Sequence, residues 1–175
     1  VILGTSVRIG EVLAIRLCDL DLKSKIPTVR ICGTIISRPG EETHRQDHPK
    51  TAGSVRRIAL PSFAVKAIRA RLQNITLRGR ETLLFSTRRG TPHTTNNIRR
   101  RLRDVTSKAG IDGVTPHRFR RAVATAINAA AGIELAAELL GHTDSRITWM
   151  HYVPRDEVVD AATATHLEEA FGTTG

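Results

Sequence analysis

The sequence predicts a mainly helical α+β domain with a small three-stranded antiparallel sheet. Three observations indicate this class. Apolar residues recur at helical spacing in several separate segments, and two β-branched stretches lie among Gly- and Pro-containing loops in the first third of the chain. The length of 175 residues and the hydrophobic content of 40% suit one domain with a core of its own.

The chain begins inside an apolar stretch, with no Met and no capping residue ahead of it. We therefore expect it to lack the N-terminal part of a longer protein. A helix is predicted through about residue 17, because apolar side chains recur at helical spacing at Ile9, Val12, Leu13 and Leu17. This helix would place Arg8 and Glu11 on one face.

Strands are expected next, in TVRICGTIIS (28 to 37) and SVRRIAL (54 to 60), because both stretches are rich in β-branched residues. The segment between them reads as a loop. A helix should follow with Pro61 at its first position, and its apolar stripe would be Val65, Ile68, Leu72 and Ile75. The short apolar run TLLFS, at 82 to 86, does not indicate which type of secondary structure it forms.

An arginine-rich helix is predicted from Thr95 to Ala109, with Ile98, Leu102 and Val105 on its buried face. Residues 88 to 103 contain six Arg and no acid, which favours contact with a DNA backbone over an ordinary solvated face. The candidate DNA-binding residues are Arg88, Arg89, Arg99, Arg100, Arg101 and Arg103, together with Arg121 further along the chain.

The next helix has clear start and stop signals: Thr115 as N-cap, Pro116 at the first position and Gly132 at the end. Its first turn would carry His117 and Arg120. A short helix, IELAAELL, should then end at Gly141 and leave His142 just beyond it. An acidic amphipathic helix is expected after residue 155, with an apolar stripe formed by Val158, Val159, Ala162 and Leu167. That stripe needs a protein partner, either its own domain or a neighbouring protomer.

Charge is distributed unevenly along the chain. Residues 1 to 121 carry a net charge of +16 and residues 122 to 175 one of −6, which together give the formal +10. Of the 27 basic residues 22 are Arg, whose planar guanidinium can bind phosphate through two N–H groups at once. Nucleic acid is therefore the leading partner, although an Arg excess can also reflect genome composition and solvated faces.

The sequence contains no run of about 18 apolar residues and no secretory leader, so neither a membrane span nor export is expected. Cys18 and Cys32 lack the spacing of metal ligands and suit core positions in a reducing compartment. We expect a soluble cytoplasmic protein.

Phosphodiester chemistry without a metal needs a nucleophile, cations that neutralise the pentavalent phosphorane, and an acid for the leaving oxygen. Tyr152 is the only tyrosine and follows His142 by ten residues. His117 and Arg120 lie at a helix N-terminus, where unpaired N–H groups and the helix dipole favour an anion. Flanking guanidinium groups would favour the phenolate of Tyr152 as attack develops.

Four segments resemble, in order and spacing, the catalytic domain of the tyrosine recombinase, or phage integrase, family: TSVRIGEVLAIRL, HPKTAGSVRRIAL, TPHRFRRAVAT and ELLGHTDSRITWMHYV. The resemblance spans about residues 1 to 153. Two departures are Ser6, where the family commonly has Gly, and Arg121, where His or Lys is frequent. Neither removes a catalytic group.

The resemblance implies a role for each matching residue. Arg8 and Arg120 would hold the non-bridging oxygens of the scissile phosphate, and Lys50 would be the general acid on the departing 5′ oxygen. His117 and His142 would assist proton transfer, Tyr152 would be the nucleophile, and Glu11 would support the site. Attack by Tyr152 would leave a 3′-phosphotyrosyl link and a free 5′ hydroxyl. The resemblance implies no cofactor and no metal.

The family also implies double-stranded DNA as partner, a homo-tetramer on paired DNA sites, and a core-binding domain that this chain lacks. We expect residues 1 to 155 to be the catalytic domain and residues 156 to 175 to be an acidic tail helix of that domain. The resemblance implies site-specific recombination, in which DNA is cut and rejoined, and two alternatives to this function remain. One is relaxation of DNA by chemistry like that of a type IB topoisomerase. The other is a non-catalytic DNA-binding module whose Arg side chains contact only phosphates.

Overall fold

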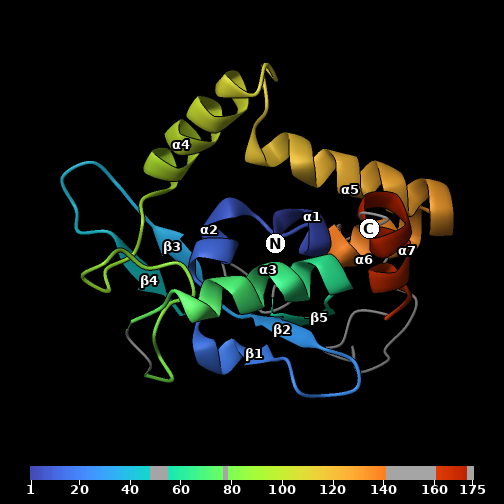
Figure 1. The fold of residues 1–175 in the computed structure, drawn as a ribbon, viewed down its shortest axis with the longest axis horizontal. Coiled ribbons are helices and arrows are strands. Elements are labelled where there is room, and N and C mark those ends of the chain that lie inside the picture. Colours follow the sequence, from blue (N-terminus) through green and yellow to red (C-terminus); the bar gives the residue numbers. More distant parts are fainter. Residues whose placement is uncertain (48–54, 77–78, 141–160, 173–175) are drawn as a thin grey trace, which may run out of the picture.

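The computed structural model describes residues 1–47, 55–76, 79–140 and 161–172 of the chain. Figure 1 shows short helices near the N-terminus together with α3 in the middle of the molecule, strands along one side, and longer helices along the other. The mainly helical α+β class with a three-stranded antiparallel sheet is confirmed.

The N-terminal segment forms two short helices, α1 (Ile2–Thr5) and α2 (Ile9–Leu13), instead of the single helix that its apolar spacing predicted. Ser6 ends α1 with a φ of 53°, in the left-handed region. A right-handed helix cannot pass through that conformation. Arg8 consequently caps α2 at its N-terminus, and Glu11 lies in the first turn of the same helix.

The three-stranded sheet has the order β1-β2-β5, formed by β1 (Leu20–Asp21), β2 (Thr28–Ile31) and β5 (Arg56–Ala59). Both of its strand pairs are antiparallel, and Val29 of β2 faces Ile58 of β5. The stretch from 28 to 37 was predicted as one strand but divides after β2. Its second half is β3 (Thr34–Ile36), which pairs with β4 (His44–Gln46) in a separate sheet. The prediction of a loop throughout 38 to 53 was therefore wrong at β4.

Helix α3 (Ser62–Gln73) lies close to its predicted position, but Pro61 is its N-cap and not its first residue. Val65 and Ile68 are buried as expected, whereas Ile75 is buried beyond the end of the helix. The run at 82 to 86 is not a regular element. It forms single β-bridges from Leu83 to Arg16 and from Ser86 to Pro92, and Leu83 and Leu84 fill the core. A short 3-10 turn, η1 (Leu17–Asp19), precedes β1.

Helix α4 (Thr95–Lys108) begins at the N-cap Thr94, whose side chain accepts a hydrogen bond from the backbone of Asn97. The predicted buried stripe is wrong. None of the residues of α4, all of which the structure describes, is buried, and Val105 is 65% exposed. Ile98 alone packs, partly buried, against a core cluster, so α4 stands away from the rest of the described chain (Figure 1).

Helix α5 (Pro116–Ala131) matches the prediction at both ends. The Thr115 side chain accepts a hydrogen bond from the backbone of Arg118, and Gly132, with a φ of 90°, terminates the helix. Helix α6 (Ile133–Leu140) follows directly and packs against α5. Gly141, where this helix was expected to end, lies outside the described residues.

The final helix, α7 (Ala162–Phe171), packs on α5 and α1 of its own chain (Figure 1). Leu167 is fully buried there, but Ala162 is exposed, so the predicted stripe is wrong at that position. Val158 and Val159 lie outside the described residues. Of the two partners considered for this helix, the structure therefore has it on its own domain.

The main core joins both halves of the chain, because Ile15 and Ile58 pack in one cluster with Ile127, Leu139 and Leu167. Cys32 is buried as predicted, but Cys18 is exposed. Within the described ranges no helix is long and apolar enough to cross a lipid bilayer.

Glu168 of α7 caps the N-terminus of α3. Its Oε2 accepts a hydrogen bond from the backbone N–H of Ser62 at 2.6 Å and one from that of Phe63 at 3.4 Å. The first N–H groups of a helix have no partner within it, so a carboxylate at this position satisfies them and interacts favourably with the helix dipole. The hydrogen bonding to Ser62 holds the pKa of Glu168 below its ordinary value.

Glu168→Gln is expected to lower the Tm at neutral pH by at most a few degrees, because the amide keeps one acceptor but loses the charge. A carboxyl whose pKa is depressed on folding stabilises the fold above its unfolded pKa and loses that effect as the pH falls through the folded value. The difference in Tm between wild type and variant should thus vanish in acid. Thermal unfolding followed from pH 7 downward checks this, and Glu169→Gln on the same helix is the matched control. A difference that persists in acid would contradict the capping role.

Candidate active site

Arg120 connects three parts of the chain. It projects from the first turns of α5 and is only 6% exposed. One terminal nitrogen donates to the backbone carbonyl of Ser6, 114 positions earlier, and the other donates to the carbonyl of Leu140 at 2.5 Å. The start of α5 is thereby fixed against the turn before Arg8 and against the C-terminal end of α6.

Arg8 and Glu11 form the neighbouring part of the site. The Oε2 of Glu11 accepts the backbone N–H of Arg8 at 2.9 Å, and its Oε1 accepts a guanidinium N–H of the same residue at 3.2 Å. Glu11 is buried, whereas 54% of the Arg8 side chain is exposed. Glu11 therefore fixes the position of Arg8, while much of the Arg8 side chain stays exposed to solvent.

A third arginine completes the cluster. Arg56 of β5 is buried and donates to Glu11 Oε2 at 3.2 Å. Burial is the main cause that lowers the pKa of Arg120 to about 10, and the positive charges of Arg8 and Arg56 lower it further against the opposing effect of Glu11. At neutral pH Arg120 stays protonated. The cluster of Arg8, Glu11, Arg56 and Arg120 thus holds three cations around one carboxylate, which suits it to bind an anion.

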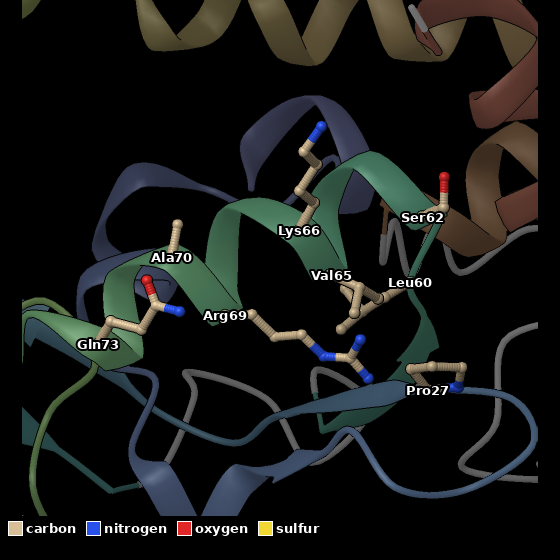
Figure 2. A pocket seen from close by; sticks show the side chains of 8 residues that line it. All are labelled: Pro27, Leu60, Ser62, Val65, Lys66, Arg69, Ala70 and Gln73. Atoms are coloured by element: carbon tan, nitrogen blue, oxygen red, sulfur yellow. The ribbon is translucent and has the colours of Figure 1, made fainter. Parts of the chain in front are cut away.

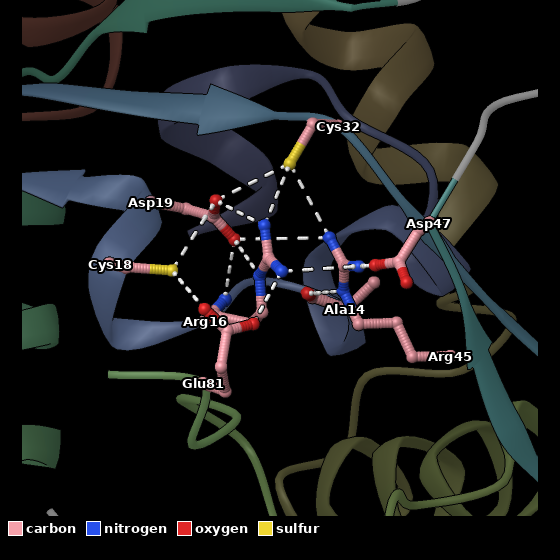
Figure 3. A network of polar contacts seen from close by, with 8 residues as sticks. All are labelled: Ala14, Arg16, Cys18, Asp19, Cys32, Arg45, Asp47 and Glu81. Atoms are coloured by element: carbon pink, nitrogen blue, oxygen red, sulfur yellow. Dashed lines mark hydrogen bonds and ion pairs between the residues drawn. The ribbon is translucent and has the colours of Figure 1, made fainter. Parts of the chain in front are cut away.

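A polar network fixes the β3–β4 hairpin to the helical part (Figure 3). Arg45 of β4 donates through Nε to the carbonyl of Ala14 at 2.8 Å and lies 3.4 Å from the sulfur of Cys32. Arg16 pairs with Asp19 at 3.1 Å in the same network. Lys50 follows β4 by four residues in the sequence, so the network fixes the strand that leads to it.

The predicted site residues divide into two groups. Arg8, Glu11 and Arg120 come together as described above, and His117 is exposed on the first turn of α5, three residues before Arg120. Lys50, His142 and Tyr152 lie outside the described residues. Their roles stay predictions.

The predicted DNA-binding arginines all have exposed side chains. Those before α4 lie in a tight turn closed by Thr87 and Thr91, where the backbone N–H of Thr87 donates to the carbonyl of Thr91 at 2.9 Å. The others are on α4 and at the start of α5. The exposed set is Arg88, Arg89, Arg99, Arg100, Arg101, Arg103 and Arg121. Their exposure leaves them able to contact phosphates.

A groove of about 530 Å³ lies beside α3 (Figure 2), and no residue of the cluster formed by Arg8, Glu11, Arg56 and Arg120 lines it. Its lining includes Pro27 and Val65, and Lys66 and Arg69 supply its charges. Its lining residues, which all belong to the described part of the chain, include no carboxylate, no imidazole and no predicted site residue. Within the described ranges, the structure also gathers no group of three His, Cys, Asp or Glu side chains that could hold a metal ion.

Sequence reasoning missed two residues of this site. Arg56 lies two positions before the buried Ile58, and in a strand residues two apart share one face, so this alternation is the signal that could have found it. Ser6 was noted only as a departure from a common Gly. Its left-handed conformation supplies the reason, because glycine adopts positive φ without steric cost.

Ser6→Gly is expected to raise the free energy of unfolding by about 1 kcal/mol, because the gain from relieving left-handed strain and a buried, unpaired hydroxyl exceeds the entropic cost of glycine. The Ser6 hydroxyl is fully buried and has no hydrogen-bond partner among the described residues. Urea unfolding measures the change. Ser6→Ala separates the two causes, since it removes the hydroxyl and keeps the strain. A Gly variant no more stable than the Ala variant would exclude strain as a cause.

The chain is similar to proteins of one family. The family model described as "Phage integrase family" matches residues 1–157. An integrase of Staphylococcus phage L54a is 32% identical over 94% of this chain and 49% of its own length. A XerC-like tyrosine recombinase of Caldanaerobacter subterraneus is 26% identical over 94% of this chain and 47% of its own length. The chain spans about half the length of the curated relatives it matches.

Solved structures show the same fold. The integrase of transposon Tn1549, in complex with circular intermediate DNA, superposes with a TM-score of 0.66 at 22% identity, over 94% of this chain and 56% of that one. The crystal structure of the XerA recombinase gives a TM-score of 0.57 at 24% identity, over 95% of this chain and 48% of that one.

Proposed function

The chain belongs to the phage integrase family, and on that premise we propose that it is the catalytic part of a site-specific DNA recombinase. Its reaction would cleave and rejoin DNA to integrate or excise a phage or another mobile element, in the bacterial cytoplasm. The observation that carries the proposal is the hydrogen bond from Arg120 to the Ser6 carbonyl. It brings the buried Arg120 beside the turn that precedes Arg8, so that the two arginines that the family motif pairs lie in one cluster with Glu11.

The proposed reaction needs no metal and no cofactor. The phenolic oxygen of Tyr152 attacks the scissile phosphorus, and the bond from phosphorus to the 5′ oxygen breaks. Lys50 donates a proton to that leaving oxygen, while His117 and His142 assist the transfer of the proton that the phenol loses. Arg8 and Arg120 hold the non-bridging oxygens as negative charge grows on them. The hydroxyl of a partner strand then reverses the step and releases the tyrosine.

The partner in this proposal is double-stranded DNA, held by the exposed arginines of the 87–91 turn and α4, and the active form is a homo-tetramer on paired sites. Contacts to phosphates fix register and orientation, whereas base edges carry sequence information. The excess of positive charge in residues 1 to 121 supports DNA as the partner, and binding should weaken steeply with salt. Residues 1 to 155 would form the catalytic domain, with the acidic tail helix after it.

The test is covalent capture of DNA. Footprinting first defines the protected sequence, and a duplex of that sequence with a nick beside the cleavage position then traps the cleaved state. We expect an adduct that survives denaturing electrophoresis, forms equally in EDTA, and carries the DNA on Tyr152 after proteolytic mapping. Relaxation of a plasmid without the site, and without strand exchange, would instead indicate topoisomerase chemistry. Salt-sensitive binding with no adduct would indicate a DNA-binding module.

A further inference from the structure

Arg56 is a buried cation that none of the family roles given above includes. It lies on the face of β5 that Ile58 places in the core, and the residue is 5% exposed. Removing a guanidinium from water is costly unless the charge is paired and hydrogen-bonded. The pairing comes from Glu11, 45 positions earlier, which links the three-stranded sheet to the start of α2.

Glu11 is held by both of its oxygens. Arg56 and the backbone N–H of Arg8 share Oε2, and the guanidinium of Arg8 binds Oε1. The bonds that Arg120 makes within the described chain go to backbone carbonyls and not to this carboxylate. Arg56 therefore helps to hold the Glu11 carboxylate in contact with Arg8. The guanidinium of Arg120 has no direct carboxylate partner among the described residues.

The charges of this cluster do not cancel. Three guanidinium groups around one carboxylate leave two positive charges, and all three cations are close enough to affect one another: Arg8 and Arg56 both lower the pKa of Arg120. A phosphodiester carries one negative charge, whereas a pentavalent phosphorane carries two. Fixed charges in a partly water-excluded site stabilise the more highly charged species more strongly, which is the differential binding that accelerates a reaction.

We propose that Arg56 is a positioning residue that holds the carboxylate of Glu11 in contact with Arg8. Arg56 also supplies the third positive charge of the cluster, and this charge makes the cluster bind a doubly charged phosphoryl group more strongly than a singly charged one. The proposal deepens the proposed function and rests on it for the identity of the reacting group. It requires that the net charge of the cluster, and not the Arg56 side chain alone, determines the rate.

The effect of the Arg56 charge is separated from that of the Arg56 contacts by comparing a single variant with a double variant. Arg56→Met leaves the described cluster with one net positive charge, whereas Arg56→Met with Glu11→Gln restores two. In single-turnover adduct formation at saturating DNA, we expect Arg56→Met to slow cleavage about 100-fold. The double variant should recover about tenfold of that loss, and Arg56→Lys should recover a similar amount. DNA affinity should change by less than about threefold in each, because remote phosphate contacts determine it. A double variant as slow as Arg56→Met, or slower, would overturn the charge role.

Tungstate, a tetrahedral dianion, gives a readout that does not need catalysis. We expect tungstate to raise the Tm of the wild-type chain and to raise the Tm of Arg56→Met much less. In the double variant the increase in Tm should again approach that of the wild type. If the wild type forms no adduct but tungstate behaves in this way, the recombinase function fails and the role of Arg56 in a dianion site stands. If tungstate does not stabilise the wild type, the Arg56 proposal fails whatever the adduct shows. Should Arg56→Met not fold, Arg56→Lys and the double variant decide, because the double variant removes the buried pair together.

Discussion

Tyr152→Phe is expected to abolish the covalent protein–DNA adduct, with a loss in single-turnover cleavage of at least about 10⁴-fold. The phenolic oxygen is the proposed nucleophile, and the change removes that atom alone. Tyr152 is the only tyrosine of the chain, so no second phenol can replace it. Denaturing electrophoresis of the protein with a nicked duplex measures the adduct.

DNA binding is the control for this variant. A phenylalanine ring has nearly the shape of tyrosine and the same charge at neutral pH, so affinity for the uncleaved duplex should stay within about threefold of wild type. Loss of binding together with the adduct would mean that the segment had been disrupted. An adduct that persists at the wild-type rate would reject Tyr152 as nucleophile.

The elements that sequence reasoning located best are those whose limits depend on local chemistry. Helix α5 begins after a Thr that caps it, has a Pro at its first position and stops at a Gly with positive φ. Each of these residues acts through its own backbone or its immediate neighbours. Neighbouring residues in the sequence therefore contain all the information that the prediction needed.

The predictions that failed depend on contacts between distant segments. Periodicity correctly gave α4 an apolar stripe, but it could not show that little of the described chain would cover it, and Val105 is exposed. The break at Ser6 is another case, because the Ser6 carbonyl accepts a hydrogen bond from Arg120, 114 positions later in the sequence. Strand β4 is three residues long and exists only through pairing with β3.

The same difference between local sequence patterns and long-range contacts applies to the candidate site. The family resemblance placed Arg8 and Arg120 on one phosphate with Glu11 in support, and the fold brings all three residues into one cluster. Arg56 has no such motif in the sequence reading. Its pairing with Glu11 depends on how β5 packs against α2, which no local pattern specifies.

Replacing Arg120 is expected to affect both the rate and the fold. Arg120→Ala should slow cleavage about 1000-fold, because a charged donor to the phosphorane is lost. It should also lower the free energy of unfolding by about 1–3 kcal/mol, since the carbonyls of Ser6 and Leu140 lose a charged partner. Single-turnover cleavage and urea unfolding measure the two effects separately.

Arg120→Lys tells these roles apart. An ammonium group keeps the charge but cannot reproduce the planar fork that reaches two acceptors at once, so stability should recover more than the cleavage rate, which we expect to stay about 100-fold below wild type. Arg118→Ala is the matched control: Arg118 lies on the same helix, is exposed and donates to the carbonyl of Gly113. It should cleave within about threefold of wild type, since it lies outside the cluster that we propose to bind the reacting phosphate. If Lys at position 120 restored the full rate, charge alone would suffice there, and the fork of the guanidinium would have no part in holding the phosphate.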